Sequence, residues 1–194
     1  ECGDLNGDGL PDLVFTSNQE IISIYTNNST AGTISFTRNQ FILPKQNDGN
    51  IRNPKRFKII DIDGDGKNDL VVGNETDNII FIYRNISTGA TITFDTPVSI
   101  TVTGAVHASG LDAGDINGNG LNALVTISAA QNDVVYVLQN ESSPGVIKMS
   151  QQVLSNTSTR LNVILADLNM DGKKDIVTTS SVSDEIDIFL NSST

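Results

Sequence analysis

The sequence predicts an all-β protein, a β-propeller built from four-stranded antiparallel blades. Three observations predict it: one motif recurs four times, short β-branched segments separate its copies, and the composition is poor in helix formers. The first acids of the four copies are Asp4, Asp61, Asp115 and Asp167, which are 57, 54 and 52 residues apart. Short strands that recur four to a unit of ~40 to 55 residues are typical of propeller blades.

The composition favours strands joined by tight turns. Ile and Val supply 37 residues against 23 for Leu and Ala, and Asn, Ser and Thr supply 57. β-branched residues suit strands, while Asn, Ser and Thr suit turns. Sustained helical periodicity is absent, which argues against helical repeats. A stacked β-solenoid, which repeats in shorter units, is the weaker all-β alternative.

Each unit follows one order of elements. A strand delivers the chain to an Asp-rich loop, as at 56–61 and 160–167 and less regularly near 106–115. A short apolar strand follows each loop: LVFTS, LVVGN, LVTIS and IVTTS. The next strand is expected at 20–27, 78–85, 133–140 and 185–191. In the first three units a turn then leads to a last strand at GTISF, GATITF and PGVIKM.

The repeat units are 1–55, 56–105, 106–159 and 160–194. The first unit has almost no first strand, and the last unit has no fourth strand. We therefore expect residues 1–194 to be a propeller fragment of about three and a half blades from a larger, seven- or eight-bladed ring. A closed four-bladed ring, in which the two incomplete units complement each other, is the alternative.

The loops carry the pattern D-x-[DN]-x-[DN]-G-x-x-D. Alternate positions 1, 3 and 5 place oxygens on one side of a tight turn, and the carbonyl of position 7 with the carboxylate of position 9 can complete an oxygen shell. This is hard-cation chemistry, which suits Ca²⁺ better than Mg²⁺ and does not suit zinc or copper. An EF-hand would need helical flanks and Glu at position 12, where Phe15, Val72, Thr126 and Thr178 stand instead.

The predicted Ca²⁺ ligands follow from these positions. Loop 1 offers Asp4, Asn6, Asp8, Leu10 and Asp12; loop 2 offers Asp61, Asp63, Asp65, Lys67 and Asp69; and loop 4 offers Asp167, Asn169, Asp171, Lys173 and Asp175. Loop 3 has Asp115, Asn117, Asn119 and Leu121 but Ala123 at position 9, so we expect it to bind weakly. The alternative is that the loops are Asx-rich turns without metal. Four copies in phase favour calcium.

With these motifs the sequence resembles the FG-GAP and VCBS-type repeat family, found in integrin α-subunit propellers and in large secreted bacterial proteins. The resemblance rests on IDIDGDGKNDLVVGN and its three siblings and covers the whole chain at blade spacing. It implies a propeller with calcium in the hairpin loops, in secreted or cell-surface proteins that adhere to or recognise proteins and glycans. The FG and GAP tags are not evident, so the VCBS-like branch is the closer match.

The charge and composition of the chain argue against several classes of function. A net charge of −11 without basic stripes argues against nucleic acid, and no apolar run is long enough for membrane insertion. One Cys and one His leave little material for catalytic groups, so we expect no enzyme. We expect an extracellular adhesion or interaction module. A lectin-like propeller, or a non-catalytic domain attached to a secreted hydrolase or lyase, is the alternative.

The expected partners are a protein or glycan ligand and the remainder of the propeller. The ligand should bind the face opposite the calcium loops, formed by residues 17–19, 73–78, 128–133 and 180–185 and connectors 44–55, 101–105 and 155–159. Basic residues gather near the longest connector, at Lys45, Arg52, Lys55, Arg56 and Lys58, and we interpret them as ordinary solvated charges. Glycosylation sequons begin at Asn27, Asn28, Asn74, Asn85, Asn140, Asn156 and Asn191, and we interpret those at turns as structural.

Overall fold

The computed structural model consists of antiparallel β-sheets, with no helix in the residues that it describes. These residues are 1–16, 21–42, 54–74, 78–105, 108–128, 134–154, 160–180 and 185–192. Within them, nothing helical is long and apolar enough to cross a membrane.

Four sheets follow one another along the chain. Sheet 1 contains β1 (Cys2–Gly3), β2 (Asp12–Thr16), β3 (Ile21–Asn27) and β4 (Phe36–Ile42). Sheet 2 contains β5 (Pro54–Ile60), β6 (Asp69–Asn74), β7 (Ile79–Tyr83) and β8 (Val98–Thr101). Sheet 3 contains β9 (Ala108–Gly114), β10 (Ala123–Ser128), β11 (Val135–Asn140) and β12 (Met149–Leu154). Sheet 4 contains β13 (Arg160–Ala166), β14 (Asp175–Ser180) and β15 (Ile186–Phe189).

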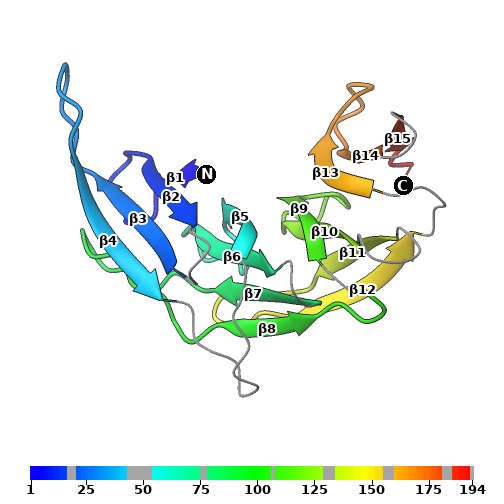
Figure 1. Ribbon diagram of the computed structural model, residues 1–194, viewed down its shortest axis with the longest axis horizontal. Helices are drawn as coiled ribbons and strands as arrows, with labels where there is room; N and C mark the ends of the chain where they lie inside the picture. Colours follow the sequence, from blue (N-terminus) through cyan, green and yellow to red (C-terminus); the bar gives the residue numbers. More distant parts are fainter. Residues whose placement is uncertain are drawn as a thin grey trace.

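The strands of each sheet pair in sequence order, as in a propeller blade. The predicted all-β class and the antiparallel four-stranded blade are therefore confirmed. Figure 1 shows the four sheets along an open arc, with the first strands β1, β5, β9 and β13 on its inner side and β4, β8 and β12 on its outer side. Neighbouring inner strands contact each other, and Gly3 of β1 lies so close to β5 that an added Cβ would be 2.6 Å from Ile59 Cγ2.

The last strand of each blade was predicted too early. The segments GTISF, GATITF and PGVIKM instead begin inside tight turns, which the isolated bridges Thr30↔Thr33, Thr88↔Thr91 and Ser143↔Val146 close. Of these segments, only the last residues Phe36 and Met149 belong to the strands β4 and β12. Gly32, Gly89 and Gly145 adopt φ of 80°, 67° and 87° in these turns, a conformation that favours glycine. β4, β8 and β12 begin only after the turns, because β-branched residues of these segments pair across the turn and not with the third strand of the sheet.

The core lies between the sheets. Ile22 and Ile24 of β3 face sheet 2 and are at most 3% exposed, whereas the alternate residues Ser23 and Tyr25 are only half-buried. Three apolar clusters of this kind fill the interfaces between sheets 1 and 2, 2 and 3, and 3 and 4. Stacked sheets that bury alternate residues against the next sheet are the arrangement expected of successive blades.

Candidate metal centre

The four Asp-rich loops connect the first strand of each sheet to its second strand. Asp4, at position 1 of loop 1, accepts hydrogen bonds on Oδ1 from the Gly7 N–H at 2.7 Å and on Oδ2 from the Gly9 N–H at 2.8 Å. Equivalent bonds join Asp61 to Gly64 and Gly66, and Asp115 to Gly118 and Gly120. In loop 4, Asp167 accepts the N–H of Asp171, at position 5, at 3.2 Å and the N–H of Gly172 at 2.9 Å. Each loop thus folds its backbone N–H groups around the first carboxylate.

Left-handed backbone makes this turn possible. The Gly at position 6 of every loop has φ between 81° and 85°, and loops 1 to 3 also have Gly at position 4. Loop 4 has Met170 at position 4, with φ of 61° and a side chain that is 90% exposed. Met170 is the non-glycine residue with positive φ in the described chain, so the sequence departs from the glycine pattern here while the loop keeps its shape.

Position 5 closes the second half of the loop. Asp8, Asp65 and Asp171 each accept the N–H of the residue two positions on, at 2.8 to 2.9 Å. In loop 3, Asn119 does the same with the N–H of Leu121 at 2.9 Å. The residues whose carbonyls were predicted as ligands, Leu10, Lys67, Lys173 and Leu121, are therefore held by the loops through their N–H groups. For Asp171, this bond and the amide of Asn169 lower the pKa.

Loop 2 brings three carboxylates together. One oxygen from each of Asp61, Asp63 and Asp65 lies within 4.8 Å of the others, and the Asp63 side chain is fully buried. Carboxylates this close repel one another unless a cation lies between them, and an all-oxygen donor set suits Ca²⁺. The residues of loop 2 therefore fit a hard divalent cation.

Loops 1 and 4 have Asn at position 3 and a different internal arrangement. The amide of Asn6 donates to Asp8 Oδ2 at 2.9 Å, and that of Asn169 donates to Asp171 Oδ2 at 3.0 Å. An amide oxygen is also a calcium ligand. These two loops thus offer two carboxylates and one amide over positions 1, 3 and 5.

The acids at position 9 lie beneath the loops. Asp12, Asp69 and Asp175 are at most 1% exposed. Asp69 accepts the Ile62 N–H at 2.9 Å and the Asn85 N–H at 2.8 Å, one on each oxygen. Asp12 and Asp175 make the equivalent pairs of bonds. These acids therefore tie the loop to the end of the third strand, whatever further role they have.

Burial raises the pKa of two of these acids. Desolvation raises the pKa of Asp69 to about 6, against the lowering effect of its two backbone hydrogen bonds and with the help of the nearby charges of Asp63 and Asp65. Desolvation also raises the pKa of Asp12, partly offset by the N–H groups of Asn27 and Leu5. A cation nearby would favour the ionised forms. Loop 3 has the buried Ala123 at this position and so lacks the tie.

Loop 2 also contains an ion pair that sequence reasoning missed. Arg84 Nε lies 2.7 Å from Asp63 Oδ2, and the Gly145 N–H of sheet 3 donates to the same oxygen at 2.8 Å. The hydrogen bond with Asp63 raises the pKa of Arg84. In the sequence, the charge of Arg84 immediately before Asn85 could have indicated this pair, because the residues at the same position of the other repeats are Thr26, Gln139 and Leu190. Arg84 partly neutralises the loop that has the most carboxylates.

In sheets 2 to 4, the asparagine at or just after the end of the third strand joins neighbouring sheets. The Asn85 amide donates to the Leu5 carbonyl of sheet 1 at 2.7 Å and to the Asn68 carbonyl of its own sheet at 2.8 Å. Asn140 bonds in the same way to Ile62 and Asn122, and Asn191 to Ile116 and Lys174. Because Asn85 and Asn140 are buried and also accept the N–H of the sequon serine, the Asn-x-Ser pattern is structural at these positions. Asn156 lies outside the described residues.

The basic residues near the first connector are only partly described. Residues 44–53, and with them Lys45 and Arg52, lie outside the described chain, and so do 17–19, 75–77, 129–133, 155–159 and 181–184 of the expected ligand face. Lys58 is on the inner strand β5, where Nζ pairs with Glu1 Oε1 at 3.2 Å and with Asp112 Oδ1 at 3.1 Å. Burial lowers the pKa of Lys58, but the bonds and charges of Asp112 and Glu1 outweigh it and raise the pKa. Lys58 therefore joins inner strands rather than forming a patch for ligands.

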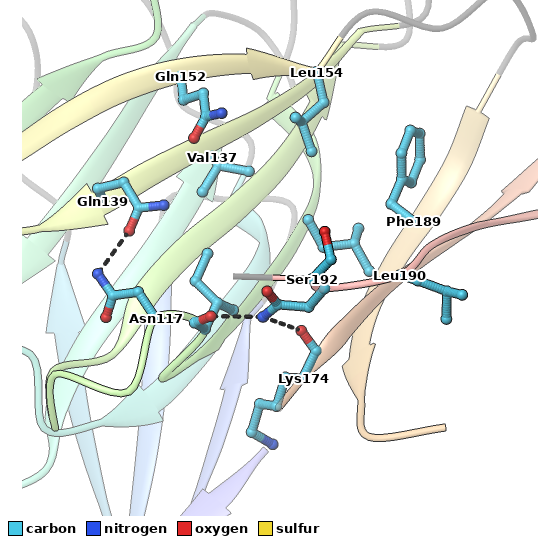
Figure 2. A pocket seen from close by; sticks show the side chains of 12 residues that line it. Asn117, Val137, Gln139, Gln152, Leu154, Lys174, Phe189, Leu190 and Ser192 are labelled. Atoms are coloured by element: carbon cyan, nitrogen blue, oxygen red, sulfur yellow. Dashed lines mark hydrogen bonds between the residues drawn. The ribbon is translucent and has the colours of Figure 1, made fainter. Parts of the chain in front are cut away.

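A cavity of about 430 Å³ lies between sheets 3 and 4, beside loop 3. Figure 2 shows Gln152 and Leu154 of β12 on one side and Phe189 on the other, with Asn117 and Gln139 hydrogen-bonded at 3.2 Å along its wall. In the neighbouring interfaces, Ile92 and Phe94 of sheet 2, or Ile147 and Met149 of sheet 3, pack against the corresponding clusters. No fourth strand follows β15 among the described residues, so no equivalent side chains fill this cavity.

Comparison with known families supports the assignment of a repeated β-sheet unit. Residues 61–126, from loop 2 to the second strand of sheet 3, match a family model described as FG-GAP-like repeat. No curated protein matches the chain. Repeats of this family are typical of extracellular proteins, generally act as non-catalytic interaction modules and often bind calcium.

Proposed function

From the FG-GAP-like repeat at residues 61–126 and the four similar sheets around it, we propose that the chain is a calcium-stabilised interaction module of a secreted or cell-surface protein. The observation that carries the calcium assignment is the carboxylate cluster of Asp61, Asp63 and Asp65, whose oxygens lie within 4.8 Å of one another. Loops 1 and 4 have the same backbone geometry with two carboxylates and an amide. Calcium supplies the positive charge that lets these oxygens lie close together.

The proposal extends to location and partners. Extracellular calcium modules commonly bind at ~10⁻⁴ to 10⁻³ M, so millimolar calcium outside a cell fills such loops and cytosolic calcium does not. The ligand is a protein or glycan held by the loops at the end opposite the calcium loops, since loops on a rigid scaffold are common binding sites. The module has no catalytic activity of its own, does not bind nucleic acid and does not insert into membranes.

The test is a calcium titration followed by thermal unfolding. Loops 1, 2 and 4 should bind three equivalents of calcium, and each site stabilises by about 2.7 kcal/mol at a hundredfold excess over its dissociation constant. Asp65→Asn should remove one equivalent. The control is Glu185→Gln, an exposed acid outside the loops, which should remove none. Absence of calcium binding, or a melting temperature that does not change with chelator, would refute the assignment.

A further inference from the structure

Loops 1 and 2 are joined by hydrogen bonds that cross the interface between sheets 1 and 2. The side-chain amide of Asn68 donates to the backbone carbonyl of Asp4 at 2.9 Å. Asp4 is position 1 of loop 1, and Asn68 is position 8 of loop 2, between the predicted ligands Lys67 and Asp69. The backbone of Asn68 therefore belongs to one predicted calcium loop, while its side chain binds the backbone of the other.

Asn85 adds a second connection between the same two loops. Its amide donates to the carbonyl of Leu5, at position 2 of loop 1, and to the carbonyl of Asn68 in loop 2. Its backbone N–H donates to Asp69, at position 9 of loop 2. Because Asn85 is buried, the loss of either amide bond would leave a buried polar group unpaired. A displacement of loop 2 is thus transmitted to two consecutive carbonyls of loop 1.

The bonds reach loop 1 at the residue that carries its first predicted ligand. The N–H of the Asp4–Leu5 peptide donates to Asp12 Oδ2, at position 9 of loop 1, at 2.9 Å. The carbonyl of the same peptide accepts the bond from Asn68. The backbone at position 1 is therefore held by its own loop on one side and by loop 2 on the other, so the orientation of the Asp4 carboxylate depends on both loops.

The same arrangement recurs between loops 2 and 3, so it belongs to the repeat. Asn122, at position 8 of loop 3, donates to the Asp61 carbonyl at 2.8 Å. Asn140 donates to the carbonyls of Ile62 and Asn122, each at 2.8 Å. Loop 3 has Ala123 at position 9, whereas loops 1 and 2 both have an acid there. The junction between loops 1 and 2 thus joins two loops that both have the full set of predicted ligands.

We propose that calcium binding at loops 1 and 2 is positively cooperative, with Asn68 and Asn85 as the positioning residues that link the two sites. This inference rests on the proposed function. Positions 7 to 9 of loop 2, once ordered by calcium, fix the amide of Asn68 and the N–H of Asn85, so loop 1 has less backbone to order when it binds its own ion. Ordering by a first ligand favours a second in this way, and the linkage is reciprocal. Direct repulsion between two divalent cations has the opposite sign.

A calcium titration of the whole chain, followed by ¹H–¹⁵N NMR, tests the proposal. The amide signals of Gly7 and Gly9 report on loop 1, because both N–H groups donate to Asp4. Asp65→Asn disables loop 2 and should raise the calcium midpoint of loop 1 at least about twofold, the smallest shift expected when a typical coupling free energy links two similar sites. Asp171→Asn disables loop 4, at the other end of the arc in Figure 1, and should leave this midpoint unchanged.

A second pair of variants tests whether Asn68 carries the link. In an Asn68→Ala background, Asp65→Asn should shift the loop 1 midpoint less than it does in the parent protein. Asn122→Ala is the matched control, because it removes the equivalent bond between loops 3 and 2, and it should leave the shift at its parent size. Both variants keep Asn85 and Asn140, so the buried bonds between the sheets remain.

The outcomes separate the link from the proposed function. A loop 1 midpoint that is unchanged or lower in Asp65→Asn, or a full shift that persists in the Asn68→Ala background, would overturn the cooperative link while calcium binding itself stands. A loop 1 that binds no calcium in the parent protein would overturn the link and the calcium assignment of that loop together.

Discussion

Replacing Arg84 with glutamine would remove the guanidinium that pairs with the buried carboxylate of Asp63. The Asp63 side chain is 0% exposed and that of Arg84 is 17% exposed, with 2.7 Å between Nε and Oδ2. Without Arg84, the nearest described donors to Asp63 are the N–H groups of Gly145 and Asp65, at 2.8 and 3.2 Å. The substitution therefore leaves a buried charge with neutral partners.

The size of the effect should depend on calcium. Removing one member of a buried ion pair costs about 3 to 5 kcal/mol, and the N–H of Gly145 places this case near 3 kcal/mol in chelator. With calcium on loop 2 the metal supplies positive charge to the same carboxylate, and the loss should fall to about 1 kcal/mol, near the value of one hydrogen bond. By linkage, the difference of about 2 kcal/mol makes calcium binding at loop 2 about 30-fold tighter in Arg84→Gln.

Calorimetric titration and thermal unfolding would measure both sides of this cycle. At this chain length about 3 kcal/mol corresponds to a melting temperature lower by about 6 to 12 °C in chelator. Arg38→Gln is the matched control, because Arg38 is exposed and donates to Ser23 Oγ at 3.2 Å. Equal destabilisation of Arg84→Gln with and without calcium, or an unchanged affinity at loop 2, would refute the view that Arg84 and calcium neutralise the same carboxylate.

Three further outcomes can be checked. Asn85→Ala should lower the free energy of unfolding in urea by about 2 to 3 kcal/mol, because it leaves buried carbonyls of two sheets without a donor, while Asn28→Ala at the exposed turn should cost less than about 1 kcal/mol. Equal losses would contradict the inter-sheet role. The raised pKa of Asp69 means that the folded state holds this proton more tightly than the unfolded state. In chelator, its contribution to stability should therefore be present below about pH 4 and lost as the pH rises through about 6, and the carboxyl ¹³C shift should titrate near 6. A midpoint near 4 would contradict it. Ala123→Asp with Asn119→Asp should give loop 3 the carboxylate count of loops 1 and 4 and add one equivalent of bound calcium, and an unchanged stoichiometry would contradict the assignment of position 9.

The repeated motif made most of the fold predictable from the sequence. Four copies of one loop at similar spacing placed the first three strands of each sheet, because the apolar residues after each loop alternate and end at Asn. The last strand was misplaced because GTISF and its siblings combine β-branched residues with a glycine. In the structure the glycine adopts a left-handed backbone conformation and forms a turn, and the strand starts after this turn. Turn chemistry outweighed strand propensity at these positions.

The loops were predictable as turns, but their partners were not. Spacing identifies which residues share a loop, and the bonds from Asp4 to Gly7 and Gly9 follow that spacing. The Arg84–Asp63 pair joins residues 21 positions apart, and the Asn85–Leu5 bond joins residues 80 apart. Such contacts depend on how one sheet lies against another, which a single sequence does not specify. The sequons were visible as a pattern, but their inter-sheet bonds appear only once the sheets are stacked.

The asparagine bonds between sheets all run in one direction. Asn85, Asn140 and Asn191 each reach back to a carbonyl of the sheet made before their own. A chain that emerges from a ribosome or a secretion channel amino terminus first therefore presents each acceptor before its donor. Each new sheet can dock on a finished neighbour as it appears, without waiting for the rest of the chain. The direction of these bonds suits assembly in the order of synthesis.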